Sequence, residues 1–490
     1  MNGRNRWPRG TTCAQLIAAL TLVGLSRALN AQASGGAATS RGERRPSLAE
    51  YEGVFAYNGN ATIALVATDT MLYAVLDDAK YPLKSLGADR FLNGAGDTIP
   101  FRKTASGTVS GFVERGVFFP RRTAVVDSAI AEIVRAVPRA ASAGPYRYTV
   151  PAALGDGITT GDGAAAGLDS ATIARLVRRV VDGTYPDVHA ILVHRGGKLV
   201  LEEYFYNHDR DRLHQMRSLT KSVVSTVVGV AVDRGLLRED ERVVARLPYE
   251  RYANPDPRKD ALTLRDLLTM QSGLACDDWD GSSPGNESKV YQSADWVKFV
   301  LDLPMQDAPG TRGRYCSGNV KVAGRMVERA TGMPFVAFAQ RHLFTPLGIK
   351  TEDVRWNYTL DASNAATFAQ VYLRPRDMLK LGLLFHQHGQ WDGRQVLSRE
   401  WVERSTAAHS TVGDQRYGYL WWHQWVNVTM PQGERRVDMI VATGNGGQKI
   451  YIVPSLDLIV VMTGGSYNKS SPSMTIMARE ILPAMLRGSR

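Results

Sequence analysis

Residues 217–235 read RSLTKSVVSTVVGVAVDRG, and this stretch decides how the rest of the chain is interpreted. Its valines favour a β-strand. The apolar character, however, extends over about 17 residues, from Leu219 to Gly235, which is longer than a typical strand. The length therefore predicts a buried helix that stops at the glycine. Ser218 then stands at the N-cap or in the first turn of this helix.

The spacing of Ser218 and Lys221 places their side chains one helical turn apart. A serine hydroxyl is a poor nucleophile without a neighbouring base. Burial lowers the pKa of a lysine, so Lys221 is expected to become that base. Backbone N–H groups at the helix start can also bind an oxyanion. The alternative is a capping serine beside a solvated lysine, and a second Ser-x-x-Lys at 466–469 shows that the tetrapeptide alone decides nothing.

Six further segments follow the serine along the chain. They are LTLRDLLTMQSGL (262–274), PGTRGRYCSGN (309–319), LFTPLGI (343–349), YLRPRDM (372–378), YGYLWW (417–422) and ATGNGGQKIYIVPSLDLIVV (442–461). Together with Ser218 and Lys221, they resemble the serine β-lactamase-like superfamily over about 170–485. That superfamily includes class C β-lactamases, penicillin-binding DD-peptidases, related esterases and aminohexanoate hydrolases. The resemblance implies an α+β fold, with an antiparallel sheet flanked by helices and an all-helical subdomain.

The resemblance also implies a role for Tyr315, which would work with the lysine in proton transfer. The family motif is Tyr-x-Asn, but this chain reads Tyr315-Cys316-Ser317, so a serine occupies the asparagine position. Asn319, two residues further on, is the other candidate for that position. The Tyr-Cys-Ser form looks most like the aminohexanoate-hydrolase branch.

The third family motif, Lys/His-Thr-Gly, reads Ala-Thr-Gly at 442–444. The alignment implies that the N–H groups of Ser218 and Asn445 hold the oxyanion together. The cation that binds a substrate carboxylate in relatives is absent from the motif, which favours esters or uncharged amides. The candidates to replace this cation are Arg416 and His423. The predicted oxyanion and substrate-binding residues are Asn445, Thr443, Gly444, Ser317 and Asn319.

Cys276 and Cys316 are the cysteines that follow the first 33 residues. In an oxidising compartment such a pair is compatible with a disulfide, but two buried thiols fit the sequence equally well. The family layout implies that both lie near the pocket. A bond between them would stabilise the fold by roughly 3–4 kcal/mol because it closes a long loop.

Composition changes along the chain predict its domains. Residues 1–33 combine early arginines, the apolar run AQLIAALTLVGL and a small-residue end, as in a secretory signal peptide. Polar residues 34–46 indicate a disordered leader. Short alternating apolar runs over 47–122 predict a small antiparallel β domain. A helix and flexible linker over 123–167 lead to the hydrolase domain, 168–490.

These features predict an exported serine hydrolase, periplasmic or secreted, that cleaves a small ester, amide or peptide-like substrate through an acyl-enzyme. No metal or organic cofactor is expected. The net charge of +11 is not gathered into a basic block, so no nucleic-acid partner is predicted. No second long apolar run indicates a membrane span after signal removal. Two alternatives stay open: β-lactamase or DD-peptidase activity, and a penicillin-binding sensor that does not turn over.

Other hydrolase classes fit the sequence poorly. Gly-Ser-Ser-Pro-Gly at 281–285 matches the α/β-hydrolase elbow, but it lies in a polar loop without the required strand and helix. His386 and His388 are the closest histidine pair in sequence, and no His-Glu-x-x-His motif accompanies them. Acidic residues at 277–280 could bind calcium, but a solvated loop is the simpler expectation.

Overall fold

A computed structural model describes residues 47–487, apart from 58–61, 77–78, 95, 115, 139–143, 248, 250 and 361–365. The predicted signal peptide, 1–33, and the predicted leader, 34–46, lie outside the described residues. Among the residues that are described, no helix is long and apolar enough to cross a membrane.

The N-terminal β region is an antiparallel meander in which each strand pairs with the next one along the chain. An antiparallel bridge from Phe55 to Arg121 joins the first strand to the residue after the last, so the sheet closes on itself. Aromatic rings fill its interior, and Phe101 contacts both Phe91 and Phe112. The strands are β1 (Gly53–Ala56), β2 (Thr62–Ala67), β3 (Leu72–Leu76), β4 (Ala79–Gly87), β5 (Arg90–Leu92), β6 (Thr98–Lys103), β7 (Val109–Glu114) and β8 (Val117–Pro120).

Residues between this region and the hydrolase domain begin with α1 (Ser128–Arg135). The segment that follows lies along the hydrolase domain: Tyr148 donates its hydroxyl hydrogen bond to the Val200 carbonyl, and Thr160 bridges to Leu199. The edge of the main sheet therefore continues into residues that the sequence assigns to the linker.

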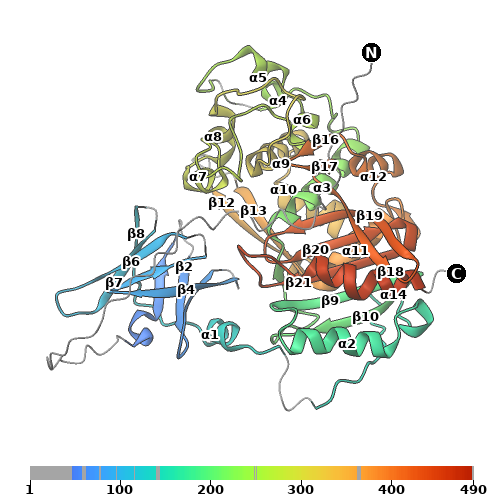
Figure 1. The fold of residues 1–490 in the computed structure, drawn as a ribbon. Coiled ribbons are helices and arrows are strands. Elements are labelled where there is room, and N and C mark those ends of the chain that lie inside the picture. Colours follow the sequence, from blue (N-terminus) through green and yellow to red (C-terminus); the bar gives the residue numbers. More distant parts are fainter. Residues whose placement is uncertain are drawn as a thin grey trace, which may run out of the picture. The chain divides into compact units, whose positions relative to one another are not determined.

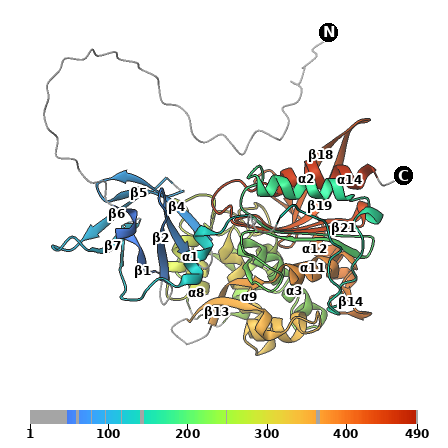
Figure 2. The ribbon, with the colours of Figure 1, turned by 90° about the horizontal axis from the view of Figure 1, so that it is seen from below.

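The hydrolase domain is built on an eight-stranded antiparallel sheet with the order β10-β9-β21-β20-β19-β18-β17-β16. Its central strands are buried on both faces, because helices α2 and α14 cover one side and α3 and α11 the other (Figure 2). The strands are β9 (Val188–Arg195), β10 (Lys198–Tyr204), β16 (Ser410–Val412), β17 (Gln415–Tyr417), β18 (Trp422–Met430), β19 (Gly433–Gly444), β20 (Gln448–Val453) and β21 (Leu458–Gly464). The helices are α2 (Ser170–Val181), α3 (Thr220–Asp233), α11 (Pro375–His386), α12 (Arg399–Thr406), α13 (Ser473–Ile476) and α14 (Leu482–Arg487).

A second, mainly helical group of elements lies beside α3, on the side away from α2 and α14 (Figure 1). It includes a small sheet with the order β11-β13-β12. The predicted class is confirmed: the fold is α+β, with antiparallel sheets, a helical subdomain and a small N-terminal β region. The helices are α4 (Val243–Arg246), α5 (Pro257–Ala261), α6 (Leu264–Leu268), α7 (Glu287–Gln292), α8 (Trp296–Asp302), α9 (Ser317–Thr331) and α10 (Phe335–Ala339). The remaining strands are β11 (His214–Gln215), β12 (Arg355–Leu360), β13 (Ala366–Leu373), β14 (Gln390–Trp391) and β15 (Arg394–Gln395).

Candidate active site

Ser218 lies in a tight 3₁₀ turn, Arg217–Leu219, that leads directly into α3. Arg217 adopts a left-handed backbone conformation with φ 51°, which turns the chain sharply before the serine. Nearly every residue of α3 is buried, so the helix is apolar on all sides and held rigidly in the core. Lys221 Nζ donates a hydrogen bond of 3.1 Å to Ser218 Oγ. The two side chains predicted to cooperate are therefore in contact.

The expectation that burial would lower the pKa of Lys221 is wrong in sign. Burial does act in that direction, but the charges of Tyr315, Glu287 and Asp278 outweigh it and raise the pKa above its ordinary value. The resting lysine is thus an ammonium that donates to the serine oxygen. It can move a proton only together with a partner that gives or takes one.

Asp278 and Glu287 form a half-buried carboxylate pair beside this lysine. Asp278 accepts backbone hydrogen bonds from Ser317 N (2.7 Å) and Glu287 N (2.9 Å), which are the first residues of α9 and α7. Burial, reinforced by Glu287, raises the pKa of Asp278 to about 6. Burial also raises the pKa of Glu287, but the nearby cations, Lys221 foremost, bring it below its ordinary value. The expectation of a solvated acidic loop is therefore wrong for Asp278.

Tyr315 belongs to an aromatic stack of three rings that contact one another pairwise, since the Trp279 and Trp422 centroids are also 6.2 Å apart. Its ring centroid lies 5.2 Å from that of Trp279 and 5.7 Å from that of Trp422, and Lys221 Nζ lies 4.7 Å from the same centroid. Tyr315 is buried, whereas Trp279 is 60% exposed. The stack fixes the tyrosine ring against the lysine and leaves one apolar wall open to a ligand.

The two candidates for the family's asparagine have different surroundings. Ser317 begins α9 and contacts the carboxylate pair through its backbone N–H. Asn319 is completely buried, and its amide faces the Met270 sulfur at 3.8 Å. Of the two, Ser317 is therefore the one that lies next to the charged groups of the site.

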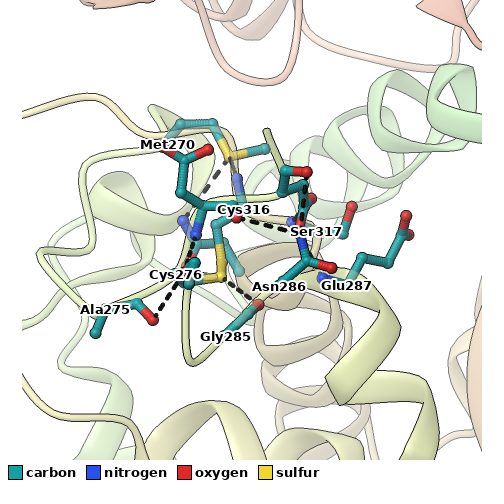
Figure 3. The surroundings of a disulfide bond; sticks show 12 residues. Met270, Ala275, Cys276, Gly285, Asn286, Glu287, Cys316 and Ser317 are labelled. Atoms are coloured by element: carbon teal, nitrogen blue, oxygen red, sulfur yellow. Dashed lines mark hydrogen bonds between the residues drawn. A yellow bond between two sulfur atoms is a disulfide. The ribbon is translucent and has the colours of Figure 1, made fainter. Parts of the chain in front are cut away.

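A disulfide joins Cys276 to Cys316, with the Cα atoms 5.4 Å apart (Figure 3). Cys316 directly follows Tyr315, and Cys276 lies two residues before Asp278. Figure 3 shows Ser317 and Glu287 beside the bond. The disulfide thus connects the loop that carries Tyr315 to the loop that carries Asp278.

The end of strand β19 packs closely against the turn that holds the serine. A Cβ atom at Gly444 would lie 2.1 Å from the Met216 carbonyl oxygen, so only glycine allows this approach. Asn445 follows it and fixes the next turn: its side chain donates to Asn468 Oδ1 (2.7 Å) and accepts from Asn468 N (3.0 Å). The strand end therefore lies beside the predicted nucleophile.

A lysine on the neighbouring strand lies beside the third motif. Lys449 pairs directly opposite Thr443 in the β19–β20 hairpin, and its ammonium donates a hydrogen bond to the threonine hydroxyl. Burial lowers the pKa of Lys449 to about 8. The sequence analysis missed this residue because it looked for the cation within the motif. The hairpin register, with a turn at 445–447, was the signal that could have found it.

Comparison with known proteins identifies the class. Residues 173–481 match the Beta-lactamase family, so the chain belongs to that family. Its members of known name include hydrolases of esters and amides, and the chain is accordingly a hydrolase of the serine β-lactamase fold.

Individual relatives are distant. The 6-aminohexanoate-dimer hydrolase of Paenarthrobacter ureafaciens is 25% identical over 56% of this chain and 71% of its own length. Esterase EstB of Burkholderia gladioli is 29% identical over 39% of this chain and 53% of its own length. A solved structure of an octameric penicillin-binding protein homologue from Pyrococcus abyssi has 16% identity and a TM-score of 0.48, covering 65% of this chain and 77% of that one.

Proposed function

We propose that this protein is an exported serine hydrolase that cleaves a small ester, amide or peptide-like substrate through an acyl-enzyme on Ser218. The hydrogen bond from Lys221 to Ser218 Oγ at the start of a rigid buried helix carries the proposal. Periplasmic or secreted localisation rests on the signal-like residues 1–33.

In the proposed reaction, Ser218 Oγ attacks the substrate carbonyl. Because Lys221 is an ammonium at rest, the pair accepts the serine proton when Tyr315 is a phenolate: Lys221 takes the proton from the serine as it gives one to the tyrosine oxygen. The N–H groups of Ser218 and Asn445 hold the oxyanion of the tetrahedral intermediate. The intermediate then expels the alcohol or amine, which takes the proton from the same pair. Water attacks the acyl-serine, and the acid leaves as the serine regains its proton. Because Lys221 is charged at rest, its positive charge also favours the negative charge that develops next to it.

The test of the proposal compares the wild-type protein with Ser218→Ala, using p-nitrophenyl acetate as substrate. We expect turnover in the wild type, a transient mass increase of one acetyl group on the peptide that contains Ser218, and neither in the variant. A stable adduct without further turnover would instead favour the penicillin-binding sensor. Undiminished turnover by Ser218→Ala would refute the assignment of the nucleophile.

Lys449 supports a further proposal on substrate class: the substrate carries a carboxylate that Lys449 and Thr443 bind. The sequence analysis favoured uncharged substrates because it found no cation in the motif, and Lys449 removes that reason. The same observation keeps β-lactamase or DD-peptidase activity as the second candidate, since β-lactams and peptide ends carry such a carboxylate.

We expect Lys449→Met to raise KM for p-nitrophenyl hydrogen succinate at least 10-fold, since a charge-assisted hydrogen bond contributes about 1.5 kcal/mol. KM for neutral p-nitrophenyl acetate should not change. Lys449 is charged below its pKa of about 8, so in the wild type KM for the succinate ester should rise as the pH increases through 8, and in the variant it should not. Equal effects on both esters would contradict the carboxylate proposal.

A further inference from the structure

Three of the nine histidines gather at one place in the hydrolase domain and are not among the residues discussed above. His189 lies on β9, His214 on β11, and His208 on the connection between β10 and β11. One ring nitrogen from each lies within 4.8 Å of the corresponding nitrogens of the other two. His189 and His214 are buried and His208 is half-buried. Imidazoles from three separate segments thus meet at one point.

The hydrogen bonds of the cluster fix where its protons lie. His214 Nδ1 lies 3.3 Å from the carbonyl oxygen of Gln215 and donates to it, so Nε2 of His214 is an acceptor. That Nε2 lies 2.9 Å from His189 Nδ1, which therefore donates to it. A backbone carbonyl that holds the distal N–H of a histidine is the usual support behind a metal-ligating imidazole.

The cluster is also electrically suited to bind a metal. Metal-ligating histidines must be neutral, and two of the three rings are buried, an environment that favours the neutral imidazole. Two cations, Arg212 and Lys80, lie near His208 and oppose a bound cation in part.

We propose that His189, His208 and His214 form a binding site for one divalent transition-metal ion, with Zn²⁺ the best match. Zinc takes three imidazole nitrogens at about 2.0–2.1 Å and commonly a water as the fourth ligand. The metal takes the place of the proton that lies between His189 Nδ1 and His214 Nε2. His189 stays neutral because its proton moves to Nε2, which is a change of tautomer.

Binding requires one local change, a rotation of His208. Its ring is now stacked on His189, with centroids 4.0 Å apart and an interplanar angle of 16°, and it stands on a connecting segment and not on a strand. Space beside His189 is preserved by Gly465, where a Cβ atom would lie 2.8 Å from His189 Nε2. The other two ligands are held by paired strands and need a smaller adjustment, from the 2.9 Å between their hydrogen-bonded nitrogens to about 3.3 Å between two ligands of a tetrahedral zinc ion.

The site would stabilise the structure and take no part in the reaction. Strand β11 ends three residues before Ser218. A metal bound by His189 and His214 would therefore connect β9 to the segment that positions the nucleophile. This role is independent of the hydrolase proposal, because metal binding is measured without any substrate.

The experiment uses the full chain without an affinity tag, stripped with a chelator and studied at pH 8, where imidazoles are neutral. Zn²⁺ is titrated in competition with a chromophoric chelator, and Co²⁺ is added separately to record its visible absorption. We expect one equivalent of tightly bound Zn²⁺, intense tetrahedral Co²⁺ bands, and a higher melting temperature with Zn²⁺ than without it.

His208→Phe keeps the stacked ring but removes the ligand, and we expect it to lose the tight equivalent, the cobalt bands and the melting shift. The matched control is His388→Asn, at an exposed position with φ 53° that asparagine tolerates, and it should bind like the wild type. A melting temperature of metal-free His208→Phe equal to that of the metal-free wild type establishes that the variant folds. Absence of tight Zn²⁺ binding by the wild type, or its survival in His208→Phe, would overturn the proposal.

Discussion

Replacing Lys221 with methionine is expected to lower kcat/KM for p-nitrophenyl acetate by about 10³-fold, within the range usual for loss of a general acid–base group. Lys221 is the cation in direct contact with Ser218 Oγ, and methionine fills a similar volume without donating or accepting a proton. The acylation rate, measured in a single turnover, should fall by the same factor because the serine proton no longer has a route away from the oxygen.

Lys321→Met is the matched control for this prediction. Lys321 is a second buried lysine, whose pKa burial lowers to about 7, and it shares the influence of Glu287 and Asp278 with Lys221. Its Nζ donates to the Ala369 carbonyl at 2.9 Å. Both substitutions remove a buried lysine amine near the same carboxylates, so both should lower the melting temperature. Only Lys221→Met should abolish acylation, and equal losses of activity would mean that net charge, and not the contact with serine, controls the reaction.

Local patterns were sufficient to predict the scaffold around Ser218. The length of the apolar run predicted a helix, and α3 spans Thr220–Asp233 and is followed by Gly235 in a left-handed conformation. Residues 190–204, AILVHRGGKLVLEEY, are typical of a hairpin around a Gly-rich turn. They are present as part of β9 and β10, whose two-residue turn has two glycines with positive φ, as such turns require. Both features depend on neighbours in sequence, which is why they can be recognised without a structure.

Features that depend on residues distant in sequence were missed. The charge state of Lys221 is set by Asp278 and Glu287, which are 57 and 66 positions away along the chain. Lys449 lies outside the third motif in sequence and is brought opposite Thr443 only by the pairing of β19 with β20. The histidine cluster joins three segments, and its members do not stand at any spacing typical of a metal motif. In each case, packing supplies information that spacing along the chain does not contain.

The disulfide could be proposed from sequence only as one of two alternatives, because pairing depends on the distance between Cα atoms. Cys276 and Cys316 are separated by 40 positions and their Cα atoms lie 5.4 Å apart. By the chain-entropy relation, a loop of this length corresponds to about 4 kcal/mol of stability at 25 °C. Loss of the bond should therefore have one of the largest effects on the free energy of unfolding that a change at two residues can have in this protein.

We expect the Cys276→Ala/Cys316→Ala variant to lose about 4 kcal/mol in urea unfolding relative to the oxidised wild type. Cys316 adjoins Tyr315, so without the bond the loop should also hold the tyrosine less firmly. We therefore expect kcat to fall while KM for p-nitrophenyl acetate changes little. A reductant should destabilise the wild type by a similar amount and leave the double variant unchanged, which separates the bond from other effects of the substitutions. Detection of two free thiols in the unfolded, unreduced wild type, or stability unaffected by the reductant, would contradict the prediction.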